Sequence, residues 1–376
     1  MDGRPVTGVV GSEEVLARLA LLKLPRVGTA TLEVLLETFG SGRSALAAPG
    51  PAFDRVTTPG TARARDNGAC LREAEAVLSR CREVGGWVMA RGDPRYPSRL
   101  EHLSSPPPLL FGRGEPELLD ARTVTVVGTR RATTYGRRVA ERLGRGLSEA
   151  GITVASGLAL GVDGAAHGGA LEGPGGTVAV LGCGVDQPYP QSNRRLFQDI
   201  GRKGLLLSEF PPGTRPAPHH FPQRNRILAA LGSATVVVEA GARSGALITA
   251  EVASGLGRAV FGVPGPVDRR SSEGTNELLR AGFAPALSVG DIIEPLGWGD
   301  LAWTSADTAE EGLEGDGSRL WEALGEGPTH VDELCQRSGL PPGRFLAVLT
   351  TLEVEGRIRA LPGRRYERAS RGAPLG

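Results

Sequence analysis

The chain has 376 residues, of which 40% are hydrophobic and 5% aromatic, and its formal net charge at pH 7 is +1. This length allows two or three domains, and the near-neutral balance excludes a protein that coats nucleic acid through its overall charge, so any polyanion site must be a local patch. The four scattered cysteines form no C-x-x-C pair and no zinc pattern with histidine, and no signal peptide or membrane span is visible. We therefore expect a cytoplasmic protein without a metal site.

Residues 11–85 contain helical patterns only, which predicts an all-helical domain. A short turn over residues 24–28 precedes the periodic stretch 31–39, as in a helix-hairpin-helix unit. Arg26 stands near the position where such a hairpin usually has its first glycine. Two roles stay open for this domain: a structural or docking role, and contact with a DNA backbone through the turn.

Residues 88–295 alternate between short β-branched stretches and helical ones. The predicted strands are 124–127, 152–155, 178–181, 205–208, 235–238 and 259–263. The predicted helices are 136–149, 164–171, 193–200, 222–231, 246–255 and 276–280. This alternation predicts an α/β fold with a doubly wound, mostly parallel sheet of the Rossmann-like type and helices on both faces.

Residues 300–317 carry acids but no Lys or Arg, which predicts an acidic linker. Residues 318–368 then show helical patterns over 319–324, 331–337 and 344–355, followed by a β-hairpin around Pro362-Gly363, as in a winged helix. Glu353 and Glu355 would repel phosphate, whereas arginines gather on the hairpin. A protein-docking or autoinhibitory role stays open beside duplex reading.

Polar and basic residues follow several predicted strands at the positions where ligands bind in open α/β sheets, beyond the carboxyl ends of the strands. These segments are Gly128-Thr129-Arg130-Arg131, the stretch from Ser156-Gly157 to Asp163, the stretch from Phe221 to Arg226 with Arg224 and Asn225, and Arg243-Ser244-Gly245. Ser156 and Ser244 can cap helices and leave backbone N–H groups for a phosphate. The sequence thus predicts an anion site at this edge.

The segment F-P-Q-R-N-R places Pro222 in a first helical turn. On a helix Phe221, Arg224 and Asn225 share one face, and Arg226 points elsewhere, so the two arginines cannot hold the same phosphate and one should pair with a carboxylate or a carbonyl. Phe221 is either a core anchor or a platform for a base. Asp163 and His167 lie one helical turn apart, and we interpret them as a structural hydrogen-bonded pair instead of an acid–base pair.

Several enzyme motifs are absent from the sequence. It has no G-x-x-x-x-G-K-[ST], no G-x-G-x-x-G after the first predicted strand of the sheet, no H-E-x-x-H and no G-x-S-x-G. Nothing in the sequence supports ATP hydrolysis, hydride transfer or acyl transfer. We therefore expect no cofactor, no catalytic residue and no enzymatic activity.

Six segments between residues 126 and 250 occur in an order that resembles the DNA-processing protein A (DprA/Smf) family. They read V-V-G-T-R-R-A-T-T-Y-G, S-G-L-A-L-G-V-D-G-A-A-H-G-G-A-L, V-A-V-L-G-C-G-V-D-Q-P-Y-P, L-S-E-F-P-P-G, F-P-Q-R-N-R and S-G-A-L-I-T-A. The family resemblance extends from about residue 91 to 283. Members often have a sterile-alpha-motif-like helical domain before this core and a winged helix after it.

The resemblance implies a protein that binds and protects single-stranded DNA in natural transformation or recombination and loads the recombinase RecA onto it. It also implies a homodimer formed through the α/β core. Carried over by motif, the DNA-binding residues are Arg130, Phe221 and Arg258. A basic residue that some members carry before the aromatic has no counterpart, since Pro218-His219-His220 stands there.

Two other functions remain as alternatives. The first is a nucleotide-binding or phosphoribohydrolase-like enzyme of a related Rossmann-like group, although Pro174-Gly175-Gly176-Thr177 lies before a predicted strand and not after one. The second is a duplex-DNA regulator that acts through the winged helix.

Overall fold

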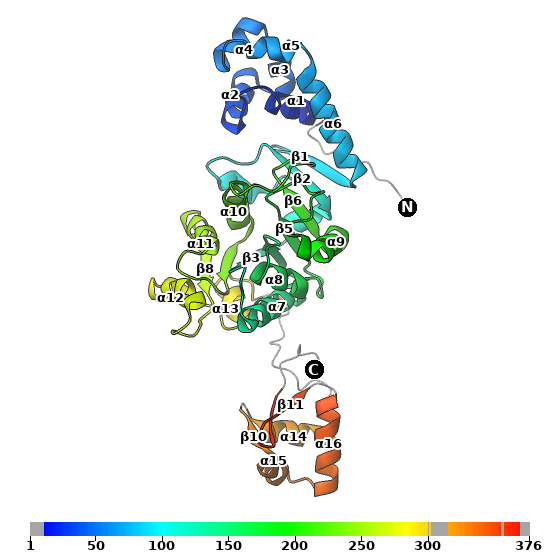
Figure 1. The fold of residues 1–376 in the computed structure, drawn as a ribbon, viewed down its shortest axis with the longest axis vertical. Helices are drawn as coiled ribbons and strands as arrows, with labels where there is room; N and C mark the ends of the chain where they lie inside the picture. The colour runs from blue at the N-terminus through cyan, green and yellow to red at the C-terminus, as the bar shows by residue number, and fades with distance from the viewer. Residues whose placement is uncertain (1–10, 300, 302–314, 326, 355–356, 369–376) are drawn as a thin grey trace. The chain divides into compact units, whose positions relative to one another are not determined.

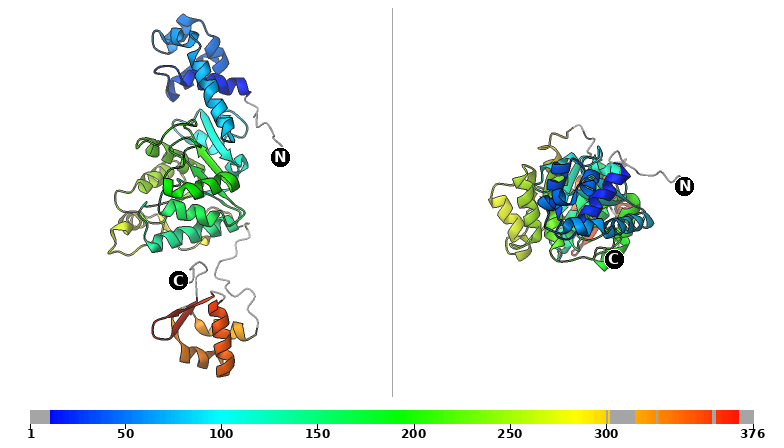
Figure 2. Two further views of the ribbon diagram at one scale, coloured as in Figure 1. Left: turned by 45° about the vertical axis from the view of Figure 1, so that its right-hand side comes forward. Right: turned by 90° about the horizontal axis from the view of Figure 1, so that it is seen from above.

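The computed structural model describes residues 11–299, 301, 315–325, 327–354 and 357–368, and it divides into two compact units, Met1–Trp303 and Thr304–Gly376 (Figures 1 and 2). In the described part of the chain, no helix combines the length and the apolar character needed to cross a membrane.

The first unit begins with helices whose apolar side chains belong to a single hydrophobic cluster. Their bounds are α1 (Ser12–Leu22), α2 (Thr29–Phe39), α3 (Gly42–Ala47), α4 (Gly50–Val56), α5 (Thr61–Asp66) and α6 (Ala69–Glu83). The predicted turn between α1 and α2 is present, and Arg26 adopts a φ of 61° there, a backbone region that favours glycine.

A nine-stranded sheet forms the centre of this unit, in the order β1-β2-β6-β5-β4-β3-β7-β8-β9. The strands are β1 (Gly86–Ala90), β2 (Leu109–Gly114), β3 (Thr123–Val127), β4 (Thr153–Ser156), β5 (Thr177–Val180), β6 (Leu205–Ser208), β7 (Ala234–Val237), β8 (Ala259–Gly262) and β9 (Ala284–Pro285). The mostly parallel sheet is confirmed, because every pair from β6 to β9 is parallel. The antiparallel edge formed by β1 and β2 was not predicted.

Helices cover both faces of the sheet, as the alternation of strand side chains requires. Val124 and Val126 of β3 belong to a cluster with α7 and α8, whereas Val127 belongs to a cluster with α10 and α11 on the other face. The bounds are α7 (Thr134–Glu149), α8 (Val162–Ala170), α9 (Arg194–Lys203), α10 (His220–Leu231), α11 (Gly245–Gly255), α12 (Glu273–Arg280) and α13 (Gly290–Ile293). α10 begins at His220, two residues before its predicted start, so Phe221 lies in its first turn.

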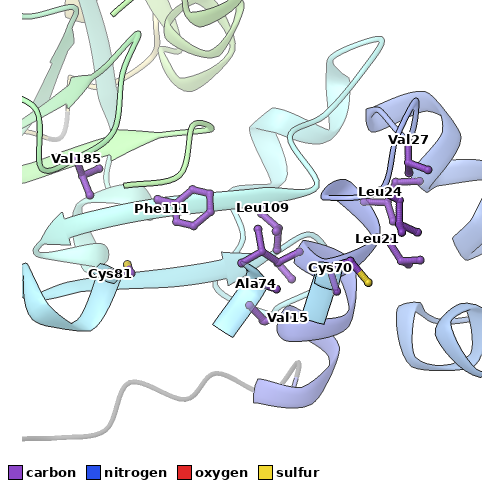
Figure 3. Packing of buried hydrophobic residues seen from close by; sticks show 14 of the residues in the cluster. Val15, Leu21, Leu24, Val27, Cys70, Ala74, Cys81, Leu109, Phe111 and Val185 are labelled. Atoms are coloured by element: carbon purple, nitrogen blue, oxygen red, sulfur yellow. The ribbon is translucent and has the colours of Figure 1, made fainter. Parts of the chain in front are cut away.

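The helical region and the sheet share one hydrophobic cluster. Val15 of α1 and Ala74 and Cys81 of α6 belong to the same cluster as Leu109 and Phe111 of β2 (Figure 3). The helices α1 and α6 therefore pack on the antiparallel edge of the sheet.

The second unit has the predicted winged-helix content. Its elements are α14 (Asp316–Leu324), β10 (Thr329–His330), α15 (Val331–Ser338), α16 (Pro342–Val354), β11 (Ile358–Leu361) and β12 (Arg365–Arg368), with strand order β10-β12-β11. Trp321, Leu334, Phe345 and Leu349 are buried at its centre. Most of the predicted acidic linker lies outside the described residues, and its last two positions, 316 and 317, belong to α14.

Candidate functional site

A pocket of about 80 Å³ opens at the carboxyl ends of the central strands. It lies beyond the carboxyl ends of β3, β4 and β5, which is the edge where open α/β sheets bind ligands. Its lining comes from the segments after β3, β4 and β5 and from the start of α10: Arg130, Gly157, Ala159, Leu160, Leu181, Gly182, Cys183, Tyr189, Pro190, Phe221 and Arg224.

Two rings and a guanidinium group lie together in the lining of the pocket. The Cζ atom of Arg130 lies 5.1 Å from the centroid of the Phe221 ring, and the Tyr189 ring lies 5.6 Å from the Phe221 ring at an interplanar angle of 33°. Arg130 is exposed and Phe221 is half-buried, and Tyr189 keeps 39% of its surface exposed. Among the residues that the structure describes, no carboxylate pairs with Arg130. The arrangement offers an unpaired cation beside accessible aromatic surface.

In the segment after β3 the side chain of Arg130 is exposed, whereas the neighbouring polar groups of Thr129 form hydrogen bonds within the protein. The Thr129 amide donates to the carbonyl of Glu239 at 2.7 Å, and the Thr129 hydroxyl accepts from the Arg131 amide at 3.2 Å. Gly128 is required by close packing, because a Cβ atom there would lie 2.5 Å from Val162 Cγ2.

The prediction that Ser156 caps a helix and frees amides for an anion is wrong. The Ser156 side chain is fully buried, and its hydroxyl donates to the carbonyl of Val126 at 2.6 Å. The amides of Gly157 and Ala159 donate to Asp163 Oδ2 at 3.1 and 3.3 Å. A carboxylate of the protein thus occupies the position that an anion would need.

His167 belongs to the same buried arrangement, but the predicted hydrogen bond between His167 and Asp163 is not formed, and both side chains have other partners. Its Nε2 accepts from the Leu158 amide at 3.3 Å, and its Nδ1 lies 2.7 Å from Thr177 Oγ1. Since the Thr177 hydroxyl donates to the carbonyl of Val154, Nδ1 carries the proton and the ring is neutral. Burial, together with the charge of Arg224, lowers the pKa of His167 to about 3, whereas burial raises the pKa of Asp163. Both residues hold the loop after β4.

Arg224 was predicted to be an anion ligand, but the structure places it in the pocket floor. It is 5% exposed, and its Nη1 donates to the carbonyl of Gly157 at 2.7 Å and to that of Val180. Asn225 is also engaged, accepting from Arg224 Nε at 3.1 Å. Arg226 pairs with Glu209 and donates to the carbonyl of Ser105 at 2.8 Å. The expectation that one of the two arginines would bind a carboxylate or a carbonyl is confirmed, and in fact both are engaged.

The segment after β7 lies next along the same edge but does not line the pocket. Ser244 caps α11, since its hydroxyl accepts from the Ala246 amide at 3.3 Å. Arg243 and Gly245 are exposed. Arg258, in contrast, precedes β8 and therefore lies at the amino ends of the parallel strands, away from the pocket, so its contact with DNA stays a prediction.

Sequence reasoning missed three further residues at this edge. Tyr189 lies between Pro188 and Pro190 in the loop after β5, and an aromatic residue flanked by prolines after a strand was the available signal. Arg269 and Arg270 are exposed in the segment after β8. That segment contacts the one after β7, because a Cβ atom on Gly241 would lie 3.1 Å from the Arg270 carbonyl oxygen.

Comparisons with known proteins agree with this fold. The family profile described as DNA recombination-mediator protein A matches residues 87–297, and a profile described as DprA winged helix domain matches residues 304–364. A putative DNA processing protein DprA from Mycobacterium tuberculosis is 45% identical over 273 residues, covering 70% of each chain. The DNA processing protein DprA of Bacillus subtilis is 37% identical over 221 residues, covering 58% of this chain and 74% of that protein.

Two solved structures are also similar. The X-ray structure of DNA processing protein A from Streptococcus pneumoniae superimposes with a TM-score of 0.62 at 34% identity, covering 74% of this chain and 95% of the other. A structure from Helicobacter pylori, described as giving insight into a unique single-stranded DNA binding mode of DNA processing protein A, has a TM-score of 0.52 at 31% identity and covers 56% of this chain and 95% of the other.

Proposed function

Because this chain belongs to the DNA recombination-mediator protein A family, we propose that it binds single-stranded DNA at the carboxyl edge of its sheet without catalysing a reaction. The observation that carries the proposal is the group of Arg130, Phe221 and Tyr189: a guanidinium group that pairs with no carboxylate of the described residues, beside one exposed ring and one half-buried ring. Unstacked bases can lie on aromatic rings, and arginine binds phosphate. A duplex keeps its bases stacked inside, so this geometry favours single strands.

The bound strand would continue from the pocket along the edge of the sheet. From β5 to β8 the edge crosses four strand spacings of about 4.8 Å each, or about 19 Å in all. Exposed guanidinium groups follow along this path, on Arg130 after β3, Arg243 after β7 and Arg269 and Arg270 after β8. Phosphates would bind these groups without reading sequence.

The buried acid and histidine of α8, the helix that follows the loop after β4, are used for structure, and we therefore propose no chemistry. Asp163 accepts from two loop amides and His167 is a neutral ring with both nitrogens engaged, so neither faces a substrate as a free base. Turnover of a mononucleotide by the purified chain would instead support the related phosphoribohydrolase-like function.

We extend the proposal to the partners that family membership implies, the recombinase RecA and a second copy of this chain. In this scheme the protein protects single strands during natural transformation or recombination and passes them to RecA. Sedimentation of the purified chain would test self-association, and RecA filament formation on strands coated with a single-stranded DNA binding protein would test loading.

The binding proposal is tested by fluorescence anisotropy with labelled oligo-dT and with duplex DNA of the same length. We expect tighter binding to oligo-dT, and a loss of affinity in Arg130→Ala that is similar for different strand sequences, since phosphate contacts carry no sequence information. Equal binding to both DNAs by the full chain, together with complete loss when residues after Trp303 are removed, would assign the activity to the winged helix and refute the proposal.

A further inference from the structure

The two rings of the pocket come from different segments, one from a loop and the other from the first turn of a helix. Tyr189 lies in the loop between β5 and α9, whereas Phe221 follows the loop between β6 and α10. A stacking platform must be held close to its productive geometry to be effective. The spacing of 5.6 Å between the ring centroids therefore depends on whatever fixes the two loops to each other.

A single carboxylate connects these two loops to the helical region. Asp186, three residues before Tyr189, accepts through Oδ2 from Arg80 Nε at 3.0 Å and from Arg80 Nη2 at 2.8 Å. Its Oδ1 accepts from the Gly213 amide in the loop after β6 at 2.8 Å. A further bond joins the two loops directly, from the Gly184 amide to the carbonyl of Thr214 at 3.0 Å. Asp186 thus ties α6 to the loop that carries Tyr189 and to the loop that precedes the helix of Phe221.

The Asp186 side chain is buried in its ionised form, which its hydrogen-bond donors stabilise. The Asp186 side chain is 6% exposed, and the side-chain amide of Gln187 supplies a further donor at 3.0 Å. Burial raises the pKa of Asp186, but the Gly213 amide and the Arg80 guanidinium outweigh this effect and hold the pKa below its usual value. Moving any donor away from a buried, ionised carboxylate costs free energy, because the negative charge is then less well compensated. The carboxylate therefore holds the segments that supply its donors in fixed positions.

Apolar packing fixes the same loop to the same helix. Val185, next to Asp186, is fully buried in the cluster that contains Cys81 of α6 and Phe111 of β2 (Figure 3). On the other side, His220 Nδ1 lies 3.1 Å from the Gly182 carbonyl oxygen, which connects the start of α10 to the loop of Tyr189. The second connection does not involve α6, so loss of the Asp186 junction should loosen the rings without releasing them completely.

We propose that Arg80 and Asp186 are positioning residues that hold Tyr189 and Phe221 at stacking distance, so that the N-terminal helical region sets the affinity of the pocket for DNA. This inference rests on the proposed single-stranded DNA binding. It assigns the helical region a role in strand binding that requires no contact between that region and DNA.

The test compares Arg80→Ala and Asp186→Asn with wild type in the full chain. The matched control is Arg82→Ala, since Arg82 is an exposed arginine of the same helix whose Nε donates to the carbonyl of Leu78 in that helix. We expect affinity for oligo-dT to fall by about 3- to 10-fold in both variants, a partial loss of one stacked base, with little change in Arg82→Ala. Arg80→Lys should retain part of the affinity.

Two readouts separate a positioning role from others. The salt dependence of binding should stay as in wild type, because Arg80 does not contact phosphate, and Arg80→Ala should have almost no further effect in a Phe221→Ala, Tyr189→Ala background. A lower salt slope would make Arg80 a phosphate ligand and overturn the inference, as would unchanged affinity in both variants.

Hydrogen exchange supplies a readout that does not depend on DNA. Arg80→Ala should speed amide exchange in residues 182–190 and 210–220 and leave α7 and α8 unchanged. Unchanged exchange in the two loops would overturn the inference even if DNA binding is confirmed. A wild-type chain that fails to bind oligo-dT would refute the proposed function, and exchange would still decide whether Arg80 and Asp186 hold the loops.

Discussion

Replacing Phe221 with alanine removes the ring at the centre of the proposed site. A stacked base is worth about 1–3 kcal/mol, which corresponds to a loss of affinity of about 5- to 150-fold. Arg130 also loses its contact with the ring, but that contact is present in the free chain as well, so its cation–π energy largely cancels in the comparison. Phe221 is half-buried and belongs to none of the three buried clusters of the first unit, so the fold should tolerate the change.

The assay is anisotropy of labelled oligo-dT at several salt concentrations. Phe221→Ala should weaken binding with an unchanged salt slope, because stacking releases no counterions. Phe221→Leu keeps most of the apolar bulk but no flat ring and should bind nearly as weakly, whereas Phe221→Tyr should bind like wild type. If Phe221→Ala and Phe221→Leu keep full affinity, the ring is not a stacking platform and the site assignment is wrong.

Arg130→Ala should weaken binding to every strand sequence alike and reduce the magnitude of the salt slope by about 0.7, which a salt titration measures. Arg224→Met should lower the free energy of unfolding by about 1–3 kcal/mol for each buried carbonyl that it leaves without a donor, and urea unfolding checks this; a variant as stable as wild type would show that the pocket floor does not need the guanidinium group. His167 has a folded-state pKa of about 3, below its unfolded value, so below pH 6.5 the unfolded state binds a proton that the folded state excludes. The free energy of unfolding should therefore fall as pH drops from about 6.5 to 3, by up to about 1.4 kcal/mol per pH unit. Urea unfolding at several pH values measures this slope, which should be smaller in His167→Gln. A chain ending at Trp303 should keep its affinity for oligo-dT, since all the proposed ligands lie in the first unit.

The sheet could be predicted because its strands carry a local signal. The six predicted strands all occur near their expected positions, since short β-branched stretches such as Val124 to Val127 are buried on both faces. The antiparallel strands β1 and β2 carry no comparable alternation with helices. Their place follows from tertiary contacts, in which β2 pairs with β6 and α1 and α6 pack on this edge.

The sequence predicts on which edge of the sheet a residue lies, because chain direction determines whether it precedes or follows a strand, but it does not predict what the residue contacts there. Arg130 and Phe221 could be placed at the carboxyl edge, and the same reasoning places Arg258, which precedes its strand, at the opposite edge. What each polar group binds depends on contacts distant in sequence, so the burial of Arg224 could not be read from its motif. The proximity of Tyr189 to Phe221 likewise depends on the junction at Asp186, which links residues 106 positions apart.

The salt dependence of oligo-dT binding, compared with duplex of equal length, tests the central claim most directly. If phosphates bind at Arg130, Arg243, Arg269 and Arg270, the slope of log K against log salt concentration for oligo-dT should be about −3, with tighter binding than to the duplex throughout. A slope near zero, or duplex binding as tight as that of the single strand, would contradict the proposal that this edge of the sheet holds a single strand by its phosphates and bases.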